Sequence, residues 1–379
     1  MNEEARIFSQ RMICPDRSGP GEIVVRDGMI VSVEDRERPS PDALDWGRDD
    51  LVPGLVDIHT DNLEKHFMPR PGAAWDAFGA ALAHDVQCAG AGITTVFDSL
   101  SLAGGKDDLD RRATLCAMIE GVDAAVAAHA LRIEHLLHLR CQSATPDLLN
   151  LLTPHLDHPR LKLLSTMDRR RDLESLERRL SRDRALGRDL SEYEQKRERL
   201  TRGQDWSRAP ANRAAVADIA HRLALPLAAH DDTTIEDVEL GVSEGCTIAE
   251  FPMAMAAAER SRAHGMTIVM GAPNFVRGCS HAGNLSARDA AAARLLDALC
   301  SDYVPMSMLR AAYLLMEPPF AWEPHAAIAT VTRAPALSVR LADRGALEPG
   351  LRADVVRVAR AANGWPVARE TWLQGRRVA

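Results

Sequence analysis

Short apolar runs alternate along the chain with longer stretches whose apolar residues have helical spacing. A short apolar run bounded by turn-forming residues is typical of a strand buried in a parallel sheet. The runs that we interpret as strands cover residues 51–60, 93–98, 132–141, 161–166, 225–230, 247–251, 267–271 and, more briefly, 299–302. The helices expected between them include residues 77–89, 108–128, 212–222, 254–264 and 287–299.

Eight β/α repeats of this kind predict an α/β protein with a (β/α)₈ TIM-type barrel. A doubly wound parallel sheet would show the same alternation, so the count alone does not separate the two folds. No glycine-rich phosphate fingerprint follows an early strand, which argues against the dinucleotide-binding form of such a sheet. The length of 379 residues also suits a barrel with a small companion domain.

The two ends of the chain carry β-hairpin patterns. Asp27-Gly28 separates two alternating apolar runs near the start, and Asn363-Gly364 separates two more near the end. Both dipeptides favour tight hairpin turns. Neither end has enough apolar surface to fold alone, so we expect them to combine into a small β-sandwich domain. Its predicted parts are residues 1–50 and 335–379, which leaves residues 51–334 for the barrel.

Residues 169–208 interrupt the alternation with a segment dense in Arg and Glu. Leu173, Leu176 and Leu180 fit one stripe of a helix, and Leu186-Gly187 predicts a turn before a second helix. Helical hairpins of this composition are usually solvated faces or dimer contacts, and we expect a homo-oligomer, most simply a dimer. The alternative is a lid that closes over an active site.

Polar side chains follow the predicted strands at the end where a parallel barrel has its active site. His59 and Asp61 point to the same side of the first strand, because strand side chains alternate between two faces. The other candidates at or near strand ends are Asp98, His138, Asp168, His230, Asp232, Glu250 and Asp302. Histidine and carboxylate ligands without sulfur favour Zn²⁺, with Mn²⁺ or Mg²⁺ as alternatives. Asp302 and Asp232 are the candidates for a general base beside such an ion.

A second set of side chains suits an anionic ligand. The loop after the first strand supplies Lys65, His66 and Arg70, and the loop after the seventh supplies Arg277 and His281. The seventh loop is rich in glycine and small polar residues, runs through Asn284 and leads into a helix, which predicts a phosphate-binding loop. Arg140 shares a strand face with His138 and would add a further cation.

Charge and cysteine content exclude several classes of protein. A net charge of -8 argues against a general nucleic-acid-binding protein. The first 18 residues lack a signal-peptide core, and no apolar stretch is long enough to span a membrane. The seven cysteines are scattered, without a Cys-x-x-Cys pair, which favours free thiols in a reducing cytoplasm over disulfides or a zinc ribbon.

Several of these motifs resemble those of a known family. The stretch from Pro53 to Asn62 and the closing segment 332–356 are similar to the amidohydrolase superfamily. Within it, four motifs resemble the PhnM-type triphosphate diphosphatases of the carbon–phosphorus lyase pathway: His59 to Lys65, His230 to Asp232, Gly271 to Gly278 with Ser280 to Asn284, and Ser301 to Tyr303. The resemblance covers nearly the whole chain.

The resemblance implies hydrolysis of alpha-D-ribose 1-methylphosphonate 5-triphosphate to the 5-phosphate and pyrophosphate, with one or two divalent ions. It implies His59, His230 and Asp302 as ligands, with Asp61 and His138 beside them and Glu250 and Asp168 as further possibilities. Lys65, Arg70, Arg140, Arg277, His281 and Asn284 would bind the substrate.

Two features depart from the superfamily pattern. The first strand has His59-x-Asp61 in place of His-x-His, and Lys162 lies too early in its strand to be the bridging carboxylated lysine. A hydrolase or deaminase acting on a C–N bond of a cyclic amide or nucleobase therefore stays as the alternative. A non-enzymatic partner in a phosphonate-degrading assembly is the third hypothesis.

Overall fold

The computed structural model describes residues 4–70, 72–102, 111–168, 170, 173, 176–177, 180, 184, 189–201, 203–280 and 284–379. Its internal contacts divide the chain into two compact units. Unit 1 comprises residues 1–98, 120–136 and 267–379, and unit 2 comprises residues 99–119 and 137–266.

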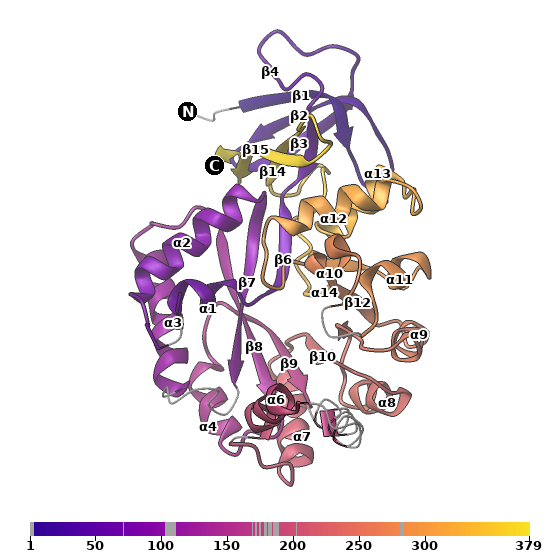
Figure 1. Cartoon of the computed structure of the whole chain (residues 1–379). Coiled ribbons are helices and arrows are strands. Elements are labelled where there is room, and N and C mark those ends of the chain that lie inside the picture. The colour runs from indigo at the N-terminus through magenta and orange to yellow at the C-terminus, as the bar shows by residue number, and fades with distance from the viewer. Residues whose placement is uncertain are drawn as a thin grey trace. The chain divides into compact units, whose positions relative to one another are not determined.

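Strands from both ends of the chain form one mixed sheet within unit 1 (Figure 1). They are β1 (Glu4–Ile13), β2 (Ser18–Arg26), β3 (Met29–Asp35), β4 (Leu44–Asp45), β5 (Asp50–Pro53), β14 (Val355–Arg360), β15 (Pro366–Leu373) and β16 (Arg376–Arg377). Their order is β16-β15-β14-β5-β1-β2-β3, with β4 on β1. Because β5 pairs with β1 on one side and with β14 on the other, it joins the two ends.

Both expected hairpin turns are present in this sheet. Arg26 pairs with Met29 across Asp27 and Gly28, whose φ angles are 52° and 78°. Two successive positive φ values are what a two-residue hairpin turn of this kind requires. Trp46 and Trp372 bring aromatic rings from the two ends within 6.5 Å in the buried core of the sheet. The domain boundaries at 50 and 335 stay a prediction.

Unit 1 also holds the first and last strands of a second sheet. These are β6 (Leu55–Thr60), β7 (Ile93–Leu102), β12 (Thr267–Gly271) and β13 (Ala298–Cys300). Its helices are α1 (Asn62–Phe67), α2 (Ala77–Gly90), α10 (Ala272–Arg277), α11 (Ala287–Ala292), α12 (Ser307–Met316), α13 (Pro324–Ala329) and α14 (Arg333–Ser338). A parallel bridge between Thr60 and Asp302 joins the end of β6 to the residues after β13.

Unit 2 holds the middle of that sheet. Its strands are β8 (Glu134–Gln142, which begins in unit 1), β9 (Leu161–Met167), β10 (Leu227–His230) and β11 (Ile248–Glu250), all paired in parallel. Its helical elements are part of α3 (Arg111–Ala127), α4 (Leu148–Leu152), the 3₁₀ turn Thr153–His155, α6 (Ser191–Thr201), α7 (Ala209–Arg222), α8 (Ile235–Ser243) and α9 (Met255–Ala263).

The eight parallel strands follow one another in chain order from β6 to β13. A doubly wound sheet reverses its order at a switch point, so this order confirms the (β/α)₈ barrel. Two predicted boundaries were wrong. The strand predicted to end at Asp98 continues to Leu102, and the helix predicted to reach Leu299 ends at Ala292, before β13.

The charged insertion contains a small apolar cluster. Leu176 and Leu180 are each 4% exposed and pack with Leu173, Leu190 and Tyr193, which confirms the predicted leucine stripe. The turn predicted at Leu186-Gly187 lies outside the described residues. Within the described part of the chain, no helix is both long and apolar enough to cross a membrane. All seven cysteines are free thiols, and most are buried.

Gly54, between β5 and β6, lies where no side chain fits. A Cβ atom there would overlap the side chain of Thr94, which is fully buried and donates its hydroxyl proton to Leu55 O over 3.3 Å. Gly54→Ala should therefore lower the free energy of unfolding by about 1–3 kcal/mol, the usual cost of overpacking. Gly19→Ala is the matched control, because a Cβ there has no neighbour within 4 Å. Equal denaturation midpoints for the two variants would contradict this packing argument.

Candidate functional site

Two backbone hydrogen bonds join the ends of the first and last barrel strands. Asp302 N donates to His59 O over 3.0 Å, and Asp61 N donates to Asp302 O over 2.6 Å. Asp302 takes a left-handed conformation with φ of 53°, which is costly for a residue other than glycine. This geometry brings ligand atoms of His59, Asp61 and Asp302 within 4.8 Å of one another.

The buried carboxylate of Asp57 also stabilises this junction. Asp57 Oδ1 accepts from Ser301 N over 3.0 Å and from His59 N over 3.4 Å. Burial raises the pKa of Asp57 to about 7, although these hydrogen bonds oppose the rise. Asp57 thus binds the backbone of His59 and of Ser301, the residue before Asp302, and is itself fully buried.

The cluster of His59, Asp61 and Asp302 has the chemistry of a divalent-metal site. Two carboxylates lie beside an imidazole, and His59 Nε2 is 3.8 Å from Asp61 Oδ1. Asp61 precedes α1, but its side chain forms no capping hydrogen bond to that helix. Carboxylate and imidazole donors of this kind fit Zn²⁺, Mn²⁺ or Mg²⁺.

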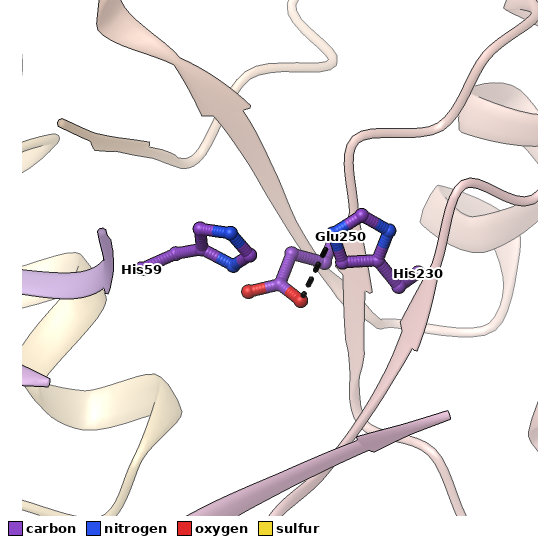
Figure 2. A group of neighbouring side chains, drawn as sticks. All are labelled: His59, His230 and Glu250. Carbon is purple, nitrogen blue, oxygen red and sulfur yellow. Dashed lines mark ion pairs between the residues drawn. The ribbon is translucent and has the colours of Figure 1, made fainter. Parts of the chain in front are cut away.

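In unit 2, His230 ends β10 and lies between acidic groups. Its Nδ1 is 3.1 Å from Asp231 Oδ2, and its Nε2 is 4.0 Å from Glu250 Oε2 at the end of β11, the ion pair dashed in Figure 2. Arg140 Nη2 lies 3.4 Å from the same Nε2. Burial would lower the pKa of His230, but Asp231 and Glu250 raise it overall. The structure therefore brings His230, Glu250 and Arg140 together.

His138 is placed differently from the other predicted ligands. Its Nδ1 is 3.0 Å from Ser99 Oγ, and its Nε2 is 2.9 Å from Ser165 Oγ. A metal at His138 would have to displace one of these hydroxyls. Asp168 is likewise engaged, since Arg170 contacts its carboxylate through both Nε and Nη2.

Asp232 lines a cavity of about 200 Å³ in unit 2, together with residues that include Arg213, His230 and Asp231. It is 6% exposed, and its buried Oδ2 has no hydrogen-bond partner among the residues that the structure describes. Burial raises the pKa of Asp232 to about 6, against the attraction of Arg213. A buried carboxylate oxygen without a hydrogen bond is uncommon, which makes Asp232 a candidate functional residue.

Lys65 lies on α1, close to the cluster of His59, Asp61 and Asp302. Its ammonium group donates to Tyr303 O and lies 4.9 Å from the centre of the Tyr303 ring. Burial lowers the pKa of Lys65, while Asp302 and Asp61 oppose the change. Arg70 follows on the same connection and is exposed.

The loop predicted to bind phosphate begins with a short helix. Arg277 is an exposed residue in the last turn of α10, which ends at Gly278 with φ of 85°. At the start of α11, Ala287 N donates to Asn274 Oδ1 and Arg288 N to Ser286 Oγ. These amide groups are already bonded, so the anion-binding prediction depends on side chains. Asn284 is half-buried, whereas His281 lies outside the described residues.

A second buried cluster was missed at the sequence level. His84, on α2, has its Nε2 3.1 Å from Asp98 Oδ1, and His135 Nδ1 is 3.1 Å from Asp98 Oδ2. The other nitrogen of His135 lies 3.5 Å from Asp85 Oδ1. Asp98 thus faces α2 from the middle of β7 and not from the end of a strand. The available signal was the polar pair His84-Asp85 inside an otherwise apolar helix.

Comparison with known proteins identifies the family. No protein-family model matches the chain. Over 382 aligned residues the chain is 36% identical to the alpha-D-ribose 1-methylphosphonate 5-triphosphate diphosphatase of Escherichia coli (strain K12), with 98% of this chain and 99% of the relative covered. The chain belongs to this diphosphatase family.

Solved structures show the same fold at lower identity. An N-acetyl-D-glucosamine-6-phosphate deacetylase from Mycobacterium smegmatis matches with a TM-score of 0.64 and 15% identity, over 99% of this chain and 100% of that one. Ochratoxinase from A. niger matches with a TM-score of 0.64 and 14% identity, over 99% and 95%. An adenosine deaminase from Xanthomonas campestris with bound zinc matches with a TM-score of 0.60 and 15% identity, over 98% and 92%.

The curated relative confirms the resemblance to the diphosphatase family, and the solved structures confirm the fold. The structure also agrees with the expectation that Lys162 is not a bridging carboxylated lysine. Lys162 is the second residue of β9 and is exposed, so it cannot bridge metals at the carboxyl end of that strand.

The charged cluster at His135 makes a pH-dependent contribution to stability. Burial would lower the pKa of His135, but Asp98 and Asp85 raise it from 6.5 to about 9. A pKa raised by folding stabilises the protein fully below about pH 6.5, and this contribution is lost as the pH rises through 9. The loss should be roughly 3 kcal/mol for one buried group.

Urea unfolding of the wild type and His135→Gln at pH 6.5, 8 and 10 checks this, because the difference between the two proteins cancels thiol ionisation. A difference in unfolding free energy that does not change with pH would show that His135 is neutral in the folded protein.

Proposed function

We propose that this protein hydrolyses alpha-D-ribose 1-methylphosphonate 5-triphosphate to alpha-D-ribose 1-methylphosphonate 5-phosphate and pyrophosphate, in phosphonate degradation. The observation that carries the proposal is the relative of this activity, which aligns over 98% of the chain at 36% identity. The reaction breaks the anhydride between the first and second phosphate groups and adds one water molecule. The deacetylase, ochratoxinase and deaminase are similar in fold alone, so they give the C–N alternative little support.

We assign His59, Asp61 and Asp302 in unit 1 and His230 in unit 2 as ligands of one or two divalent ions, with Zn²⁺ as first choice. Glu250 is a further ligand candidate because of its distance from His230. A bound ion of this class supplies Lewis acidity and makes hydroxide available near neutral pH. His138, which contacts two serine hydroxyls, would serve as a ligand only after losing one of them.

Asp302 is the first candidate for the general base. The backbone hydrogen bonds with His59 and Asp61 fix the backbone of Asp302 at the candidate metal cluster. In this role Asp302 accepts a proton from water as the new P–O bond forms. Asp232 is the second candidate, since its raised pKa of about 6 suits a base that works near neutral pH.

Cationic side chains on the loops would bind the charged ends of the substrate. Lys65 and Arg70 follow β6, Arg140 lies on β8, and Arg277 ends α10. Together with His281 and Asn284 they can donate hydrogen bonds to phosphate and phosphonate oxygens. We also place the protein in the cytoplasm, in keeping with its seven free thiols, and we expect a homodimer.

The activity is tested with purified protein, added Zn²⁺, Mn²⁺ or Mg²⁺, and a substrate panel scored for pyrophosphate against orthophosphate. The ribose triphosphate should yield pyrophosphate, and a nucleoside triphosphate should yield it more slowly. Asp302→Asn should lower kcat by at least about 100-fold, because a general base contributes 10²–10⁴-fold. Turnover of cyclic amides or aminated nucleobases without pyrophosphate release would overturn the proposal.

Metal content tests the ligand assignment separately. His230→Ala should reduce the bound metal measured by elemental analysis while leaving the far-ultraviolet circular dichroism spectrum unchanged. His221→Ala is the matched control, because His221 lies in the last turn of α7 and is not a proposed ligand. An unchanged metal stoichiometry in His230→Ala would remove His230 from the ligands.

A further inference from the structure

Helix α1 begins directly after Asp61 and carries Lys65. On its own this short helix would not be stable. It spans only Asn62 to Phe67, and the side chain of Asp61 does not cap its first turn. An isolated helix of six residues is unstable in water, so other contacts must fix its position. The position of Lys65 therefore depends on what α1 is attached to.

Polar contacts attach α1 to α2. Asn62 is 3% exposed, and its Nδ2 is 3.0 Å from His84 Nδ1 and 2.8 Å from Gln87 Oε1. His66, one turn later on α1, has its Nε2 2.9 Å from the same Gln87 Oε1. Both contacts of Asn62 use its amide nitrogen, so Asn62 donates to His84 and to Gln87.

The contact with Asn62 determines which ring nitrogen of His84 carries the proton. Nδ1 accepts from the Asn62 amide, so the ring proton lies on Nε2 and is donated to Asp98 Oδ1 over 3.1 Å. Burial lowers the pKa of His84, which keeps the ring neutral and preserves both contacts. One imidazole therefore links α1 to the barrel strand β7.

The chain of contacts continues to a rigid anchor. Asp98 also binds His135 at the start of β8, and His135 lies beside Asp85 of α2. Asp85 Oδ1 accepts from Arg132 N over 2.8 Å and from Ile133 N over 3.0 Å. A buried network with each member bonded resists displacement, because any break leaves a polar group without a partner.

We propose that His84 is a positioning residue for the reaction, which acts through Asn62 and α1 to hold Lys65 beside the carboxylates of Asp61 and Asp302. His84 lies on α2 and does not contact the substrate in this scheme. The inference rests on the proposed function only for the assignment of Lys65 to the polyphosphate. The attachment of α1 itself rests on the hydrogen bonds alone.

Two substitutions separate the two contacts of His84. In His84→Gln, the side-chain amide can still donate to Asp98 from near the Nε2 position, but the contact with Asn62 is lost. In His84→Asn, the amide oxygen can still accept from Asn62 near the Nδ1 position, but the contact with Asp98 is lost. If positioning through Asn62 matters most, His84→Gln should raise KM for the triphosphate by about tenfold with kcat changed less than about twofold. His84→Asn should have a KM much closer to that of the wild type than His84→Gln has.

A double-mutant cycle with Lys65→Met shows whether His84 acts through Lys65. Residues that act as one unit give non-additive effects, so His84→Gln should change KM little once Lys65 is absent. Thr371→Val is the control, because Thr371 is also fully buried and its hydroxyl donates to Ala89 O on α2, outside the network that links α2 to α1. It should lower the melting temperature and leave KM within about twofold. Fully additive effects of His84→Gln and Lys65→Met on KM would overturn the proposal.

Hydrogen exchange of α1 gives a readout that needs no turnover. Amide protection over residues 62–67 should fall in His84→Gln and stay at the wild-type level in Thr371→Val. Unchanged protection in His84→Gln would also overturn the proposal. If the wild type releases no pyrophosphate while His84→Gln loosens α1, the proposed function has failed and the attachment of α1 by His84 stands.

Discussion

The junction between β6 and the residues after β13 is the constraint on which the candidate site depends. Two backbone hydrogen bonds and the buried carboxylate of Asp57 hold His59, Asp61 and Asp302 together, whatever their side chains do. The left-handed backbone of Asp302 has a cost, and strain of this kind persists where the surrounding structure fixes it. The placement of these three candidate ligands is therefore coupled to the pairing of the first and last barrel strands.

Charged side chains form two separate groups on the barrel strands, one at the strand ends and one facing α2. Towards the strand ends, the carboxylates of Asp61 and Asp302 lie beside the His59 imidazole and near Lys65, and this set of donors suits a metal ion. Facing α2, Asp98 is matched by His135, and the pKa of Asp98 falls well below its usual range despite burial. In the group facing α2, ion pairs and hydrogen bonds between the side chains account for their closeness.

The sequence predicted the features of the fold that follow from the local pattern of apolar and polar residues. The turn at Asp27-Gly28, for example, followed from its dipeptide. Partners distant in sequence could not be predicted in this way. Nothing near Asp98 in the chain indicates that its partner is His84 on α2, and the pattern could not show that β7 runs four residues past Asp98. The serine contacts of His138 depend on register between neighbouring strands, which local pattern does not encode.

The barrel alone does not explain why this family would act at phosphorus. Deacetylase, ochratoxinase and deaminase share the fold at 14–15% identity, so the strands are compatible with attack at carbon. A triphosphate carries several negative charges that an amide lacks, so cationic side chains beyond the metal ligands can help to bind it. Lys65 on α1 and Arg277 on α10 lie on connections that leave the barrel strands, where a sequence can change without altering the sheet. If Lys65 and Arg277 bind the polyphosphate as proposed, the selection of a phosphorus centre depends on these connections and on the contacts that hold them in place. The proposed role of His84 on α2 follows from this, because it would act on substrate binding through α1 without contacting the substrate.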